Sequence, residues 1–202
     1  MNILNLIDFY EDITDAMNSF TEESDRGVVL ISAALIDETL GEIIRKKLVS
    51  SKNNNDELFE IPYAPLKSFS AKINFSYRLG LINKKTHSVF HQIRDIRNKF
   101  AHGFLPISFE DQTIFDKTLN ILSHYYGYII EILFRTLVDQ QLLKEIKEIQ
   151  NDNSVKKNAN KILKLVGTRN VYEKICAFIY ACLKDKEQKI LQINFENSDS
   201  VL

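Results

Sequence analysis

The chain has 202 residues, of which 45% are hydrophobic and 26% charged, with a net charge of −1 and a pI near 6.4. The apolar content excludes a disordered chain, and the balanced charge excludes a protein that binds nucleic acid through a uniformly basic surface. Only six Gly and three Pro are present, which favours an all-α fold, an antiparallel helical bundle. We expect this bundle over residues 1–150 and a C-terminal helical extension over 151–202, packed on the same domain.

Two helices are predicted in the first fifty residues. Apolar residues recur at helical spacing between residues 2 and 20. Thr21 or Ser24 is placed to cap a second helix that runs to about Val49. The second helix carries three carboxylates at helical spacing. We expect them to pair with a cation or to face water, as such carboxylates usually do. They are Asp37, Glu38 and Glu42.

The next pair of helices follows a polar, turn-rich segment over residues 50–60. The pattern predicts a helix over 65–79, where Gly80 ends it, because glycine is the usual residue just after a helix C-terminus. A further helix is predicted over 83–102, and Gly103 ends it.

The C-terminal half is predicted to contain one long helix and a separate helical unit. Ser108 and Asp111 resemble a capping box, which predicts a helix that runs to about Leu133. Residues 151–160 are polar and are expected to form a linker. Helical periodicity returns over 162–183.

The two cysteines and the N-terminal segment bear on cofactors and location. Cys176 and Cys182 are six residues apart in a helical segment, too far for an unstrained disulfide, so both are predicted to be reduced core residues. No zinc-finger or EF-hand spacing is present, so no metal or other cofactor is expected. The sequence has no signal-peptide pattern and no apolar run near the roughly 20 residues that cross a bilayer. We therefore expect a soluble cytoplasmic protein with no membrane association.

The most distinctive chemistry lies in HSVFHQIRDIRNKFAH, residues 87–102. An apolar stripe at spacings of four, three and four predicts one amphipathic helix that faces a core. The stripe consists of Val89, Ile93, Ile96 and Phe100. The opposite face is rich in Asn and His, which are mediocre helix formers, and this composition makes it our first candidate for a functional site. This face consists of His91, Arg94, Asp95, Asn98 and His102, with Arg97 at its edge.

Three runs of the sequence resemble the mannitol operon repressor (MltR) family. They are AALIDETLGEIIRKKL from Ala33, PLKSFSAKINFSYRLGLI from Pro65, and IRDIRNKFAHGF, which ends at Phe104. The resemblance implies an intracellular regulator of transcription. The chain shows no helix-turn-helix with basic recognition residues, so such a regulator is expected to act through a protein partner.

Arg97 and Asn98, followed by three residues and His102, also resemble the signature of the HEPN superfamily of helical bundles. Active HEPN proteins are metal-independent RNases, often toxins or antiphage effectors, which act as dimers. The resemblance implies that His102 is the general base toward a ribose 2′-hydroxyl or the acid to the leaving oxygen. It also implies that Arg97 stabilises charge on the phosphate and that Asn98 orients either Arg97 or His102. Residues expected to bind the RNA are Arg94, Lys99 and His91.

Three hypotheses follow for Arg97, Asn98 and His102. The first is an MltR-like regulator; the second is a HEPN-type RNase, whose partners are RNA and an antitoxin. In the third, the residues are structural, and Arg97 pairs with an acid such as Asp37 or Glu38. Because Arg97 and His102 point about 140° apart on one helix, a functional site requires a second helix or subunit, and a homodimer is expected.

Overall fold

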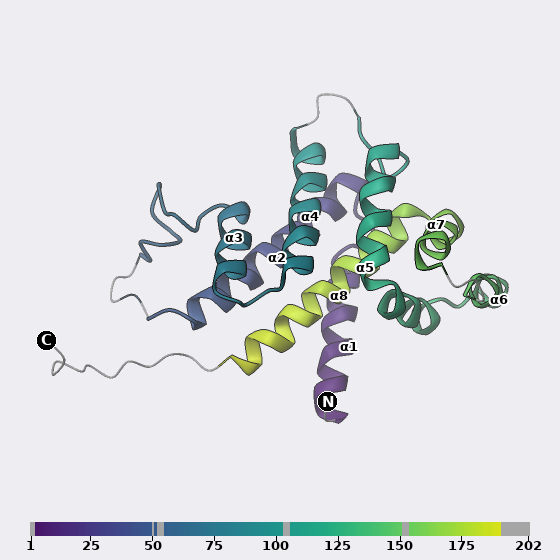
Figure 1. Cartoon of the computed structure of the whole chain (residues 1–202), viewed down its shortest axis with the longest axis horizontal. Helices are drawn as coiled ribbons and strands as arrows, with labels where there is room; N and C mark the ends of the chain where they lie inside the picture. Colours follow the sequence, from purple (N-terminus) through teal and green to yellow (C-terminus); the bar gives the residue numbers. More distant parts are fainter. Residues whose placement is uncertain (1–2, 50, 52–54, 103–105, 151–153, 191–202) are drawn as a thin grey trace, which may run out of the picture.

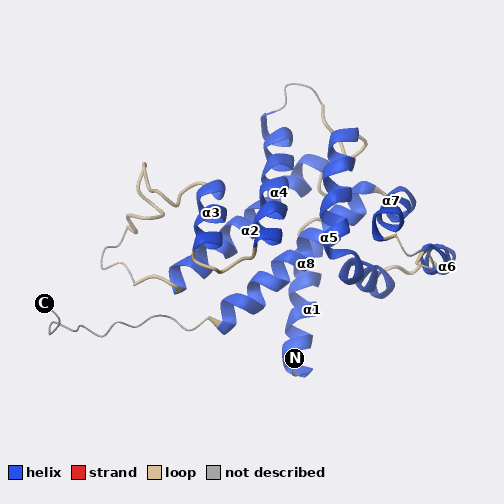
Figure 2. Ribbon diagram, in the orientation of Figure 1, coloured by secondary structure: helices blue, strands red, loops and turns tan. Residues whose placement is uncertain are grey.

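A computed structural model describes residues 3–49, 51, 55–102, 106–150 and 154–190 of the chain. The described residues form eight α-helices and no strand, which confirms the predicted all-α fold (Figure 2). The helices are α1 (Ile3–Asn18), α2 (Asp25–Lys46), α3 (Phe69–Arg78), α4 (Lys84–His102), α5 (Gln112–Thr136), α6 (Gln140–Ile149), α7 (Val155–Val166) and α8 (Thr168–Lys189). In Figure 1, α3 lies at one side of the molecule and α6 and α7 at the other, with α2, α5 and α8 between them.

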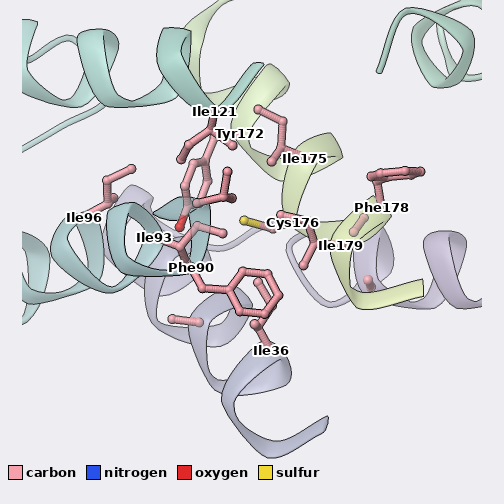
Figure 3. Packing of buried hydrophobic residues seen from close by; sticks show 14 of the residues in the cluster. Ile36, Phe90, Ile93, Ile96, Ile121, Tyr172, Ile175, Cys176, Phe178 and Ile179 are labelled. Carbon is pink, nitrogen blue, oxygen red and sulfur yellow. The ribbon is translucent and has the colours of Figure 1, made fainter. Parts of the chain in front are cut away.

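The core is built around α8, which packs against α1, α2, α5 and α7. Figure 3 shows that side chains of α2, α4 and α5 pack against those of α8. Ile36 comes from α2, Phe90 and Ile93 from α4, Ile121 from α5, and Tyr172 and Cys176 from α8. Each of these residues is at most 1% exposed. The division of the chain near residue 150 stays a prediction, but α7 and α8 share this one core with the preceding helices.

Side-chain caps fix where the helices before the candidate site begin. Ser24 caps α2, as predicted, and its hydroxyl accepts a hydrogen bond from the Gly27 N–H at 3.0 Å. The third helix begins at Phe69, four residues later than predicted, because Ser68 supplies the cap. Its end agrees with the prediction, since Gly80 adopts a φ of +70°. Gly103, predicted to end α4, lies outside the described residues.

Two predictions in the second half of the chain were wrong. Asp111, and not Ser108, is the N-cap of α5, although one bond of the predicted capping box is formed, because the Asp111 carboxylate accepts from the Ser108 N–H at 3.0 Å. Of the linker predicted over 151–160, residues 151–153 lie outside the described residues, and the remainder is helical from Val155 onward, with Asn158 and Ala159 buried together with Ile162 further along the same helix. Gly167, with a φ of +92°, then separates α7 from α8.

The predicted free thiols are confirmed, but one of the two cysteines is not a core residue. Both thiols are free, but only Cys176 is buried, and Cys182 is exposed. A six-residue step turns a helix through about 240°, so the two side chains leave α8 on different sides. None of the described helices combines the length and the apolar character that crossing a membrane requires.

Candidate functional site

The polar face of α4 is oriented by its apolar stripe. Val89, Ile93, Ile96 and Phe100 are at most 2% exposed, which confirms the stripe that the sequence predicted. Asn83 fixes the start of the helix, because its Oδ1 accepts from the Thr86 N–H at 2.9 Å. The remaining faces of α4 contact α3, α5 or solvent, and the predicted site residues fall into three groups along its length.

The first group, in the N-terminal half of α4, is a histidine pair that meets α3. His87 and His91 place their Nε2 atoms 3.2 Å apart, and Asn74 Oδ1 of α3 lies 2.9 and 3.0 Å from them. The Tyr77 ring packs on the His87 ring at a centroid distance of 4.7 Å. Burial lowers the pKa of His91, and the nearby Arg94 charge lowers it further, which favours the neutral imidazole.

The second group, in the middle of α4, joins three helices through hydrogen bonds. Arg94 donates to the Ser70 hydroxyl and to the Asp95 carboxylate, each at 2.8 Å. Lys117 of α5 donates to the other Asp95 oxygen at 3.2 Å. Burial raises the pKa of Asp95, but these two cations outweigh it and leave the pKa below its usual range. Arg94, predicted to bind RNA, is thus engaged within the chain.

The third group is the Arg97, Asn98 and His102 motif at the C-terminal end of α4. Arg97 and Asn98 are half-buried, and His102 is exposed. Within the part of the chain that the structure describes, none of these three side chains has a hydrogen bond or an ion pair. The ion pair between Arg97 and Asp37 is not formed, because Lys72 donates to Asp37 at 2.8 Å. Hydrogen bonds and ion pairs to described residues therefore do not hold the motif side chains in place.

An additional cation lies at the same end of α4. The Arg26 guanidinium of α2 donates to the Ala101 carbonyl at 3.1 Å, which satisfies one of the backbone acceptors that a helix C-terminus leaves open. Lys99 is exposed in the last turn. We call Arg26, Arg97, Lys99 and His102, together with Asn98, the α4 C-terminal cluster. Guanidinium and imidazole groups of this kind bind phosphate or carboxylate oxygens.

Sequence reasoning missed Arg26 and Asn74. Arg26 is 75 residues from the carbonyl that it contacts, and no local pattern signals such a pairing. The contact of Asn74 with the histidines is equally non-local, although the four-residue step from His87 to His91 does place the two rings on one helix face. Among the described residues, no group of three or more His, Cys, Asp or Glu is placed to hold a metal ion.

A cleft lies near the other end of α4 and is separate from the α4 C-terminal cluster. It encloses about 460 Å³ between the α3–α4 turn, α5 and α8. Its lining includes Thr86 and Phe90 of α4, Tyr125 of α5, and Cys182 and Lys186 of α8. No residue of the Arg97, Asn98 and His102 motif lines it.

Comparison with known proteins identifies a family for this fold. No curated protein and no solved structure matches the chain. A model of a domain of unknown function, DUF4145, matches residues 33–152, more than half of the chain. The match runs from the middle of α2 past α6, and it includes all of α4. The chain therefore belongs to the DUF4145 family.

Proposed function

We propose that this protein is a regulator of the MltR type, which acts on transcription through a protein partner bound at the α4 C-terminal cluster. One contrast along α4 carries the proposal. His87, His91, Arg94 and Asp95 are all engaged with neighbouring side chains, whereas the Arg97, Asn98 and His102 side chains contact no described residue through a hydrogen bond or ion pair. Cations that pair with no described residue favour an anionic partner surface.

The runs that resemble the MltR family lie within the part of the chain that the DUF4145 model matches. All three begin and end within residues 33–152. Asn98 and His102 lie opposite the buried stripe of α4 and Arg97 lies at the edge of that face, and the exposed His102 gives a partner access to the motif without unfolding the bundle. A second copy of the chain would bring a second α4 to the same place, as the divergent directions of Arg97 and His102 require.

A complementation experiment tests the regulatory function. Deletion of the gene should change the level of a defined set of transcripts, and wild-type protein should restore them. The double variant Arg97→Ala/His102→Ala should fail to restore them, whereas His124→Ala, on α5, should restore them fully. A deletion that leaves every transcript unchanged, or full rescue by the double variant, contradicts the proposal. The purified protein should show no sequence-specific binding to duplex DNA.

A metal-independent RNase of the HEPN type is the second candidate, and the exposure of His102 favours it. An exposed imidazole suits proton transfer at a ribose, and a guanidinium that pairs with no described residue suits charge stabilisation at its phosphate, once a second α4 brings the two groups together. If this function holds, overexpression arrests growth and the pure protein cleaves RNA in EDTA. Arg97→Ala and His102→Ala should each abolish cleavage while the far-UV circular dichroism is unchanged. RNA that stays intact at high protein concentration across many sequences contradicts the RNase.

A further inference from the structure

The histidine pair of α4 and Asn74 of α3 form a triangle of nitrogen and oxygen atoms. Its sides are 2.9 Å from Asn74 Oδ1 to His87 Nε2, 3.0 Å from Oδ1 to His91 Nε2, and 3.2 Å between the two Nε2 atoms. His87 and His91 are half-buried and Asn74 is exposed, so the triangle is open to ions from solvent. The Tyr77 ring holds the His87 ring from one side.

Hydrogen bonds alone cannot satisfy this triangle. An imidazole Nε2 either carries a proton and donates or lacks one and accepts, and each end of an amide is purely an acceptor or purely a donor. Three atoms of this kind cannot alternate donor and acceptor around a closed triangle. At least one of the three contacts therefore sets two lone pairs, or two N–H groups, against each other, whichever tautomers and amide orientation are present.

A cation resolves this conflict because it accepts lone pairs from all three corners. Zinc binds imidazole nitrogen at about 2.0–2.1 Å, and tetrahedral angles then place two ligand nitrogens about 3.3 Å apart. The 3.2 Å between His87 Nε2 and His91 Nε2 matches this separation. The Asn74 oxygen lies within about 0.4 Å of the corresponding distance from each nitrogen.

We propose that His87, His91 and Asn74 form a binding site for a divalent transition metal, best suited to Zn²⁺. Two imidazole nitrogens and one amide oxygen occupy three positions, and the fourth is left to water or an anion. Arg94 lies nearby and opposes a cation, but its charge is compensated by the hydrogen bond to Asp95 at 2.8 Å. The site departs from the sequence prediction of no metal because its third ligand comes from a different helix.

Metal binding links α3 to α4 in this proposal and does not involve the α4 C-terminal cluster. His91 and Arg97 are six residues apart, which is about 9 Å along a helix axis. A failure of the metal-site proposal would therefore leave the proposed function untouched, and the reverse also holds. Ligand binding to the folded state alone also raises its stability, which gives a readout that needs no activity.

The test uses the full-length chain freed of any histidine tag and titrated with ZnCl₂ by calorimetry. We expect one equivalent to bind, and a metal concentration a hundredfold above Kd to raise Tm by about 5–10 °C. CoCl₂ should give the visible absorption of a tetrahedral site. His87→Ala and His91→Ala should each weaken binding at least about tenfold, whereas His124→Ala should bind as the wild type does.

A substitution at the exposed Asn74 tests the site even if the histidine variants fail to fold. Asn74→Asp replaces the amide oxygen with a carboxylate at the same reach and should tighten Zn²⁺ binding about tenfold or more, because an anionic ligand attracts the cation more strongly. The proposal is overturned if the wild type binds no Zn²⁺. It is equally overturned if both histidine variants bind as the wild type does, or if Asn74→Asp leaves the affinity unchanged.

Discussion

The guanidinium of Arg169 donates to the carboxylate of Asp25 at 3.0 Å and so joins the first turns of α8 and α2. The same guanidinium donates to the Glu23 carbonyl at 2.6 Å and to the Glu173 carboxylate at 2.8 Å. The second Asp25 oxygen accepts from the Phe109 N–H at 3.1 Å. One carboxylate and one guanidinium thus hold together the N-terminal ends of α2 and α8 and the segment that leads into α5.

We expect Arg169→Ala to lower the free energy of unfolding by about 1–2 kcal/mol, because it removes three charge-assisted bonds from a partly exposed site. Arg169→Lys keeps the charge but loses the planar fork, and its loss should be intermediate. Urea unfolding of Arg169→Ala, Asp25→Ala and the double variant measures the coupling between the two side chains. Strictly additive losses would show that they act independently.

Phe100 and His102 lie on one turn of α4, but alanine substitution should lower the free energy of unfolding much more at Phe100 than at His102. Phe100 is 2% exposed, and Phe100→Ala should cost about 3–5 kcal/mol of stability through the cavity that it leaves. His102→Ala removes an exposed side chain and should change stability by less than about 0.5 kcal/mol. Equilibrium unfolding in urea distinguishes the two. A His102→Ala protein that unfolds readily would return His102 to a structural role.

The two thiols should be separated by their reactivity toward Ellman's reagent. Burial raises the pKa of both thiols to about 12, so access of the reagent and not acidity separates them: Cys176 is 1% exposed, whereas Cys182 is exposed. Native protein should therefore react with one equivalent through Cys182, and denatured protein with two. Cys182→Ala should show no reaction until guanidinium is added. Rapid reaction of native Cys182→Ala protein contradicts the burial of Cys176.

Glu187 should make stability depend on acid. Burial raises the pKa of its carboxyl, but the hydrogen bonds from Lys184 and Lys46 outweigh this and leave the pKa below its usual range. A lowered pKa in the folded state contributes stability above the ordinary carboxyl pKa of about 4.3, and this contribution is lost as the pH falls from that value through the lower pKa of the folded state. Glu187→Gln should flatten the fall of unfolding free energy over this window. Glu110→Gln, at an exposed glutamate, is the matched control and should leave the slope unchanged.

Local patterns predicted those parts of the fold that local physics determines. The stripe of α4, the Ser24 cap and the Gly80 stop each depend on residues within about three turns of one another. Arg26 with Ala101, Lys72 with Asp37, and Asn74 with His91 are separated by 75, 35 and 17 residues, and they meet only because whole helices pack together. The linker predicted over 151–160 failed because α7 begins at Val155 in a polar stretch whose buried residues include a polar one, Asn158, beside Ala159.

Helix α8 lies at the centre of the core but outside the part of the chain that the family model matches. The family match ends at residue 152, yet Tyr172, Ile175 and Cys176 fill the space between α2, α4 and α5 (Figure 3). A chain cut after residue 152 would expose the apolar surfaces that these residues cover, and it should aggregate or remain molten. The stretch that is recognisable across relatives is therefore smaller than the stretch that folds, and experiments on it should include the chain through Lys189.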